Sequence, residues 1–260
     1  MNKTLNLPNF EIVKPLITDI FDRLKTVFDI DTILGFYLGG SLAIGGFDEA
    51  KSDLDFLIVL RGTPTDTEIE KLRDMHNAIK SSHKNRLYDN YEGIYLTFEQ
   101  ARNLKHVDMH APHLGSEGHF GMEDHGPEVL IDLWKIRKSG FVVYGRQPKK
   151  LIGEISDDEM IQAKIDLFKS WWLPKLKRRE PMDAEYQAYA VLTMTRILYG
   201  LANHAEVSKK ESAAWCIDHY NRQAELIYDA IAWEPGKDLD KLEQVYGLIE
   251  LVKKQIEHTS

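Results

Sequence analysis

The residues best suited to chemistry are a Gly-Gly-Ser sequence and a pair of aspartates that follows it. Gly39, Gly40 and Ser41 come directly after a short apolar run, and Asp53 and Asp55 stand at the start of another. Glycines after a strand let the backbone approach a phosphate closely, and a serine adds a hydroxyl donor. Two aspartates at this spacing project from one face of a strand and repel each other unless a cation lies between them. Oxygen ligands favour Mg²⁺, which usually brings substrate phosphates with it.

A third carboxylate, Glu92, begins the next predicted strand. If that strand lies beside the aspartate strand, Glu92 joins the pair as a metal ligand or as a general base. Each acid also has a simpler interpretation: Asp53 and Asp55 suit an exposed strand edge, and a glutamate that opens a strand is usually solvated. The glycines at the preceding strand end favour the metal site.

The elements that position these residues form an α/β module in the first part of the chain. Apolar runs predict buried strands, and apolar residues at steps of three and four predict amphipathic helices, the first with its regular part beginning near Pro15. The segment 103–127 holds several His and Gly and has no clear period, so we expect a long loop there. The predicted strands cover residues 33–38, 54–60, 91–98 and 140–145, and the predicted helices cover residues 10–28, 66–83 and 128–138.

The second half of the chain has helical patterns almost throughout. Pro174 suggests a kink or an early end in the first of these helices. Ser208 and Glu211 make a capping box that starts the third. A Gly-Arg-Gln-Pro turn near residues 146–153 predicts the boundary between the two parts. The predicted helices cover residues 157–178, 184–204, a segment from 208 through 215, 222–233 and a last helix that includes residues 239–256.

Composition excludes several classes of protein. The chain has 260 residues, with 33 Lys and Arg against 41 Asp and Glu and a net charge of -8, which argues against a dedicated duplex-DNA binder. Cys216 stands alone, so an intrachain disulfide framework and a cysteine-rich zinc module are excluded. No apolar run approaches the ~20 residues of a membrane span, and the first residues lack a signal-peptide pattern. We expect a cytoplasmic monomer that binds neither nucleic acid nor membrane.

The Gly-Gly-Ser and Asp-x-Asp pattern with its later carboxylate resembles the polymerase-β-type nucleotidyltransferase superfamily. More specifically, the chain resembles the aminoglycoside 3''/9-adenylyltransferases, which inactivate streptomycin and spectinomycin. Residues 208–215, SKKESAAW, are similar to a helix-starting segment of that family, and Arg196 lies at the spacing of a family arginine. The resemblance implies an α/β nucleotidyltransferase domain with a mixed sheet over residues 1–150. It also implies an all-α helical bundle over residues 151–260 that completes the nucleotide and acceptor site.

The resemblance also implies the roles of the matching residues in the first domain. Asp53 and Asp55 would bind Mg²⁺ together with Glu92, and Glu92 would be the base that deprotonates the acceptor hydroxyl. The triphosphate of ATP would be held by cofactor-binding residues that flank the aspartates, namely Gly40, Ser41 and Ser52.

In the helical domain the resemblance implies that Arg196 and Lys209 reach the nucleotide phosphates, so that ATP would bind between the domains. A cation in the first turn of a helix opposes the helix dipole, and this modest cost fits a phosphate-binding role for Lys209. Both residues retain a structural alternative: Lys209 as an ordinary exposed helix residue, and Arg196 as an ion-pair partner.

The expected reaction is transfer of AMP from ATP to a hydroxyl of a small cationic acceptor, with release of pyrophosphate. An acidic site suits the ammonium groups of an aminoglycoside. No Trp lies in the segment 119–123, where streptomycin-modifying relatives have one, and Tyr186 replaces a family Asp, so we favour spectinomycin over streptomycin. The alternatives are an acceptor other than an antibiotic, AMP transfer to a protein or RNA, and a catalytically silent nucleotide-binding module.

Two further groups of residues have competing interpretations. The histidines of segment 103–127 suit either a zinc site or the lining of the acceptor pocket, and the absence of a His-Glu-x-x-His pattern favours the second. The pair Trp171 and Trp172 is predicted to pack between helices. The histidines concerned are His106, His110, His113, His119 and His125.

Overall fold

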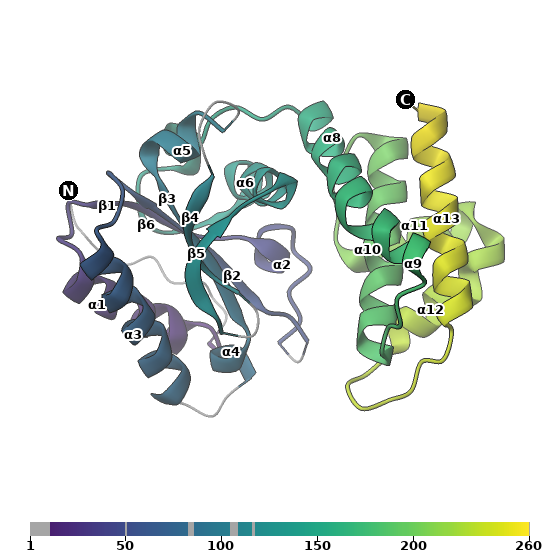
Figure 1. Ribbon diagram of the computed structural model, residues 1–260, viewed down its shortest axis with the longest axis horizontal. Coiled ribbons are helices and arrows are strands. Elements are labelled where there is room, and N and C mark those ends of the chain that lie inside the picture. The colour runs from purple at the N-terminus through teal and green to yellow at the C-terminus, as the bar shows by residue number, and fades with distance from the viewer. Residues whose placement is uncertain (1–10, 50, 83–85, 105–108, 116–117, 260) are drawn as a thin grey trace. The chain divides into compact units, whose positions relative to one another are not determined.

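The computed structural model describes residues 11–49, 51–82, 86–104, 109–115 and 118–259 of the chain. Its residues fall into two compact units, Met1–Ile155 and Ser156–Ser260 (Figure 1). The first unit contains a mixed sheet with helices and the second is helical, which confirms the predicted fold class.

A six-stranded sheet forms the centre of the first unit, in the order β5-β4-β3-β2-β1-β6. β2 and β3 are parallel, and each of the other neighbouring pairs is antiparallel. This mixed arrangement brings the aspartate strand and the Glu92 strand side by side. The strands are β1 (Ile33–Leu38), β2 (Leu54–Leu60), β3 (Tyr91–Thr97), β4 (His110–Leu114), β5 (Phe120–Asp124) and β6 (Phe141–Gly145).

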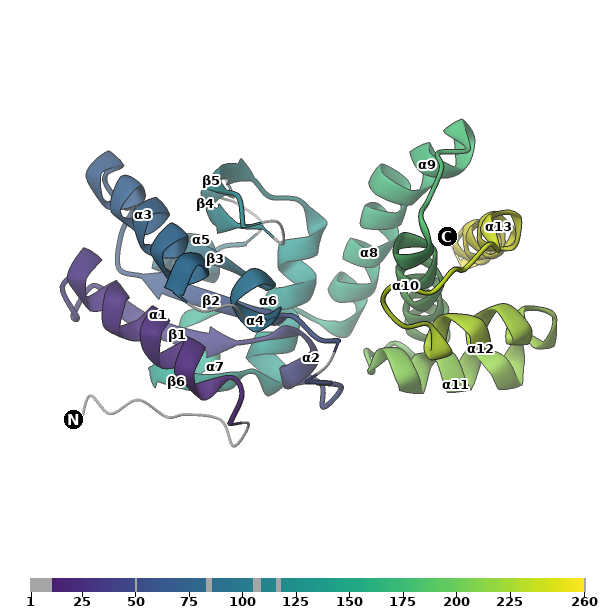
Figure 2. The same cartoon turned by 90° about the horizontal axis from the view of Figure 1, so that it is seen from below.

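Helices α1 and α3 pack together against one face of this sheet (Figure 2). Their apolar positions recur at helical spacing, and the side chains of Ile20, Phe36 and Leu72 lie in the core that they share with the sheet. Pro15 lies in the first turn of α1, as the sequence predicts. The helices of this unit are α1 (Lys14–Val27), α2 (Gly40–Ala43), α3 (Asp66–Ser82), α4 (Arg86–Asp89), α5 (Phe98–Arg102), α6 (Pro127–Ser139) and α7 (Pro148–Leu151).

The segment predicted as a long loop over residues 103–127 instead contains the β4–β5 hairpin, so that prediction is wrong. Proline, histidine and glycine hide the strand alternation, because Pro112 normally argues against a strand that has neighbours on both sides. Here β4 pairs with β3 at Gly93 and Ile94 alone, and such a short pairing tolerates a proline. His106 lies outside the described residues.

The second unit contains the helices expected from the sequence, with two local differences. The last helix, expected to include residue 239, begins at Leu242. The helix predicted over residues 157–178 passes through a π-helical turn. Pro174 lies in the first turn of the helix that follows, where a backbone N–H has no partner within that helix, so a proline is tolerated. Trp172 is buried, as predicted, but Trp171 is 51% exposed. The elements are α8 (Asp157–Leu167), the π-turn η1 (Phe168–Trp172), α9 (Leu173–Arg178), α10 (Ala184–Asn203), α11 (Lys209–His219), η2 (Asn221–Gln223), α12 (Ala224–Ala232) and α13 (Leu242–Thr259).

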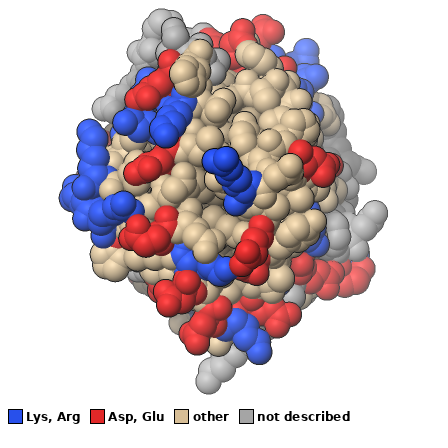
Figure 3. All heavy atoms as spheres, turned by 90° about the vertical axis from the view of Figure 1, so that its right-hand side faces the viewer, with Lys and Arg blue, Asp and Glu red and all other residues tan. Residues whose placement is uncertain are grey.

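The molecular surface carries both signs of charge. Figure 3 shows one face on which basic and acidic side chains are interspersed around a broad uncharged area. Among the helices of the described residues, none combines the length and the apolar character needed to cross a bilayer.

Candidate active site

The three carboxylates that the sequence singled out meet at one end of the parallel strand pair. Asp55 on β2 and Glu92 on β3 are register partners, so their side chains project from the same face of the sheet. Asp53 lies two residues before Asp55, just ahead of β2, and its side chain is 48% exposed. The parallel pairing therefore gathers the acids as the sequence predicts.

The glycine turn after β1 lies directly against Asp55. Gly40 has φ +51, a left-handed conformation that favours glycine, and a Cβ on it would come within 1.5 Å of the Oδ2 atom of Asp55. The Gly39 amide donates to the backbone carbonyl of Asp55 at 2.9 Å. Only a glycine at position 40 leaves the Asp55 carboxylate in place, so this turn and the aspartate strand form one structural unit.

The two serines assigned to the nucleotide have different surroundings. Ser41 lies in the short helix α2, and its carbonyl accepts from the Gly46 amide at 2.9 Å. The Ser52 hydroxyl oxygen accepts from the Asp48 amide at 2.9 Å, and the Ser52 amide donates back to the Asp48 carbonyl at 2.7 Å. Ser52 thus closes the loop that leads into β2.

The surroundings of Glu92 make this carboxyl a weaker acid than usual. Burial raises the pKa of Glu92 to about 7, and the charges of Asp55, Asp53 and Asp132 add to the effect. Asp132 lies on α6 and forms an ion pair with Lys135 at 3.0 Å. Sequence reasoning missed Asp132, because it lies in an ordinary amphipathic helix with no local motif around it.

Arg86 on α4 is a second residue that the sequence did not reveal. Its guanidinium donates to the carbonyls of Lys51 and Ser52 and lies 3.3 Å from the Oδ1 atom of Asp53. It therefore fixes the loop before β2 and supplies a positive charge beside the first aspartate. A lone arginine gives no sequence signal of such a role.

These residues suit a divalent cation shared with a substrate. Within the described residues, no group of three or more His, Cys, Asp or Glu side chains forms a ready metal centre. Asp53 and Asp55 flank the glycine turn, and Mg²⁺ typically takes one or two carboxylates together with phosphate oxygens and water. The close acids, and the raised pKa of Glu92 that they help to cause, fit a site that is completed by a cation.

In the helical unit, the two cations assigned to the nucleotide phosphates lie on different helices. Arg196 on α10 lies 3.8 Å from the carboxylate of Glu206, whose side chain is 1% exposed, and the Nε atom of Arg196 is buried with no hydrogen-bond partner. Lys164 also pairs with Glu206. Lys209 is the first residue of α11 and is exposed, with its ammonium 5.7 Å from the centre of the Tyr189 ring. The phosphate roles of Arg196 and Lys209 stay predictions.

Tyr186 belongs to an aromatic cluster on the same unit. Its hydroxyl accepts a hydrogen bond from the Trp171 indole at 2.9 Å, and its ring lies 5.6 Å from that of Tyr189 and 5.9 Å from that of Trp172. Where the relatives recognised from the sequence have an Asp, this chain thus has an aromatic residue in an aromatic setting.

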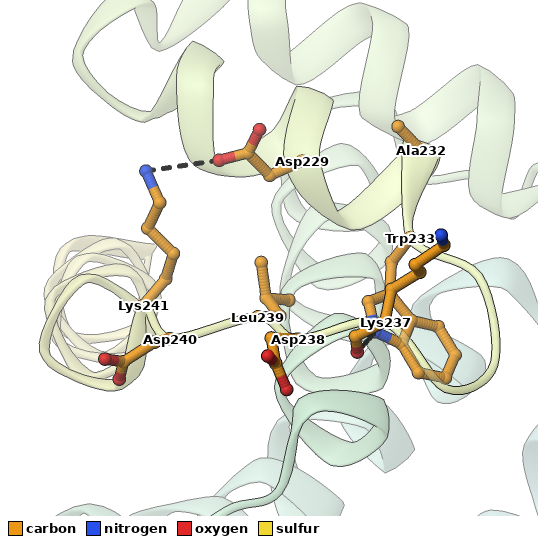
Figure 4. A pocket seen from close by; sticks show the side chains of 8 residues that line it. All are labelled: Asp229, Ala232, Trp233, Lys237, Asp238, Leu239, Asp240 and Lys241. Carbon is orange, nitrogen blue, oxygen red and sulfur yellow. Dashed lines mark hydrogen bonds and ion pairs between the residues drawn. The ribbon is translucent and has the colours of Figure 1, made fainter.

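An open pocket of about 330 Å³ lies between α12 and the segment that leads to α13 (Figure 4). Lys241 pairs with Asp229 at 3.2 Å, and the Trp233 indole donates to the Lys237 carbonyl at 2.8 Å. These groups are satisfied within the pocket wall. The pocket belongs to the helical unit, and none of the three carboxylates lines it.

Comparison with known proteins agrees with this arrangement. A family model described as a nucleotidyltransferase domain matches residues 17–109, and one described as the C-terminal domain of aminoglycoside adenylyltransferase matches residues 150–258. A crystal structure of a spectinomycin adenyltransferase from Enterococcus faecialis, solved with ATP and spectinomycin, is similar with a TM-score of 0.70 and 16% identity. The similarity covers 94% of this chain and 98% of that one. A comparison with curated proteins gives no match. The chain therefore matches, in order, a nucleotidyltransferase domain and the C-terminal domain of aminoglycoside adenylyltransferase.

Proposed function

We propose that the protein transfers AMP from ATP to a hydroxyl of a small cationic acceptor and releases pyrophosphate. The observation that carries the proposal is the meeting of Asp53, Asp55 and Glu92 beside a glycine turn in which a Cβ at Gly40 would collide with the Asp55 carboxylate. The acceptor that we favour is spectinomycin or a related aminocyclitol or aminoglycoside. The similar enterococcal enzyme, whose structure contains ATP and spectinomycin, supports this choice of donor and acceptor.

Each residue of the site has a task in this reaction. Asp53 and Asp55 would hold Mg²⁺, which when bound neutralises charge on the triphosphate. The glycine turn at residues 39–41 lets the donor phosphates approach the backbone closely. Glu92 takes the proton of the attacking hydroxyl, and a pKa near neutrality suits a general base at physiological pH. Positioning and charge neutralisation, rather than covalent chemistry, account for most of the acceleration of phosphoryl-type transfer.

The helical unit has a part in the same proposal. Arg196 and Lys209 would bind phosphate oxygens of the nucleotide, Arg196 through guanidinium hydrogens other than those turned toward Glu206. The buried Nε atom of Arg196, which lacks a hydrogen-bond partner, supports a role beyond the ion pair.

The test is pyrophosphate release with ATP and Mg²⁺ across spectinomycin, streptomycin and other aminoglycosides, comparing the wild type with Glu92→Gln. We expect turnover with a cationic acceptor, a loss of ~100-fold or more in Glu92→Gln, and retained ATP binding. Glu70→Gln is the matched control, because Glu70 is an exposed residue of α3 paired with Arg73. Full activity of Glu92→Gln would remove Glu92 as the base. ATP binding without turnover on any acceptor would favour the silent nucleotide-binding module.

A further inference from the structure

A row of polar side chains continues past Glu92 on the same face of the sheet. Ile94, two residues after Glu92, pairs with His113 on β4, and Ala111 pairs with Glu123 on β5. Directly opposed residues share a face, and so do residues two apart on one strand. Glu92, His113 and Glu123 therefore all project from the face that carries Asp55.

The order of the strands indicates which end of this row faces the donor and which end faces the acceptor. The glycine turn follows β1, the aspartates stand at β2, and the base stands at β3. A donor whose phosphates lie at the glycine turn occupies the β1 side of Glu92. The attacking hydroxyl must come from the side opposite to the leaving pyrophosphate, so the acceptor lies toward β4 and β5.

His113 and Glu123 form a polar pair at that place. The Nδ1 atom of His113 lies 2.9 Å from the Glu123 carboxylate, and the two side chains are 25% and 39% exposed. An ionised carboxylate only accepts hydrogen bonds, so Nδ1 of His113 donates to Glu123 and Nε2 is left to bind another group. The pair therefore presents a carboxylate and an imidazole nitrogen side by side.

The neighbouring His125 keeps this corner free of added positive charge. Its ring lies 5.0 Å from that of His113, edge to face, and its buried Nε2 atom has no hydrogen-bond partner. Burial is the main cause that lowers the pKa of His125, and the neighbouring His113 adds to it, so His125 is neutral near pH 7. A cationic group of a ligand thus meets no imidazolium of His125.

We propose that the His113–Glu123 pair binds the acceptor, with Glu123 taking an ammonium group and His113 Nε2 forming a hydrogen bond with a hydroxyl of the same molecule. The proposal rests on the proposed function and adds the residues that select the acceptor. The recognised chemistry is an amine with neighbouring hydroxyl groups, as in an aminocyclitol.

The same hairpin supplies a matched control. His110 and Asp124 are register partners, and the Nδ1 atom of His110 lies 2.6 Å from the Oδ1 atom of Asp124. Both side chains project from the opposite face of the sheet and are 45% and 90% exposed. A substitution there removes the same chemical groups from the same hairpin without touching the face of Glu92.

The experiment measures pyrophosphate release with spectinomycin as the probe acceptor, at saturating ATP and Mg²⁺. We expect His113→Gln and Glu123→Gln each to raise the KM for spectinomycin about tenfold, which corresponds to about 1.4 kcal/mol. We expect kcat and the KM for ATP to change less than about twofold, and His110→Gln and Asp124→Asn to match the wild type. Equal KM values in the variants of both faces would overturn the proposal.

Calorimetric binding of spectinomycin and a panel of aminoglycosides separates this inference from the proposed reaction. Binding that is present in the wild type and weakened in Glu123→Gln supports the pair even if no AMP is transferred. Binding that is unchanged in Glu123→Gln, or absent from the wild type for every panel member, overturns it. Unfolding temperatures of the variants, compared with the wild type, show whether a weaker interaction reflects a damaged fold.

Discussion

Two clusters of charge in this molecule differ in how they are compensated. In the sheet unit, Asp53, Asp55 and Glu92 lie together, with Arg86 beside Asp53. In the helical unit, the buried Glu206 has two cations around it, Lys164 and Arg196. A buried charge that is paired within the protein holds a particular packing in place. Like charges that lie together repel each other, and a bound ligand of opposite charge would stabilise them. The comparison separates a cluster in which opposite charges meet from one in which like charges meet.

Removing a carboxylate from the acidic cluster should have the largest effect. It should lower activity without lowering stability. We expect Asp55→Asn to lower AMP transfer by about 10³-fold, since charge neutralisation at the phosphates is worth several kcal/mol. Because the substitution also relieves repulsion, the unfolding midpoint of the variant should equal or exceed that of the wild type. Pyrophosphate release and thermal unfolding test the two halves of the prediction. A variant that is both active and less stable would contradict the comparison.

Breaking the compensated cluster should act on stability instead. Lys164→Met removes a buried cation from beside the buried Glu206 carboxylate, and we expect a loss of about 3 kcal/mol in the free energy of unfolding. Urea unfolding followed by circular dichroism measures it. The control is Lys253→Met, because Lys253 and Glu257 are paired but well exposed, and their loss should cost under about 0.5 kcal/mol. Similar losses of unfolding free energy in Lys164→Met and Lys253→Met would mean that burial of the ion pair does not determine its contribution to stability.

The smallest expected effect comes from His76, a buried neutral side chain that makes the free energy of unfolding depend on pH. His76 is 2% exposed and bonded to the hydroxyls of Tyr91 and Tyr95, and burial lowers its pKa from 6.5 to about 3. Between these two values the unfolded chain binds a proton that the folded protein does not, so stability falls as the pH falls below 6.5. The slope approaches about 1.4 kcal/mol per pH unit.

His76→Gln cannot take up this proton. The free energy of unfolding should therefore fall about 1.6 kcal/mol further in the wild type than in His76→Gln between pH 6.5 and 5. Urea unfolding at the two pH values gives the difference directly. Parallel losses in the two proteins would show that His76 is protonated in the folded state.

Sequence reasoning was strongest where a motif combines local geometry with chemistry. The Gly-Gly-Ser turn and the Asp-x-Asp pair are short, and the pairing of Asp55 with Glu92 follows once β2 and β3 are neighbours. The short-range signals of caps were equally reliable: Ser208 and Glu211 form the capping box that the sequence predicts.

The sequence was weakest where a role depends on distant parts of the chain. Asp132 joins the acids and Lys164 meets Glu206 because helices pack in a particular way, and neither pair has a local pattern. The β4–β5 hairpin was missed since Pro112 and the surrounding histidines are typical of loops. Pro174 indicates a disturbance in the helix over residues 157–178, but it does not show that this takes the form of a π-helical turn, nor that Trp171 is exposed while Trp172 is buried.

The position of β6 affects how the chain folds during synthesis. β6 pairs with β1, although about 100 residues separate the two strands in the sequence. At typical rates of 5–20 residues per second, the ribosome needs roughly 5–20 s to make the intervening segment. Throughout that time the outer edge of β1 is unpaired on the nascent chain and open to pairing with other strands. Protection of that edge while translation proceeds is therefore a requirement of this sheet order.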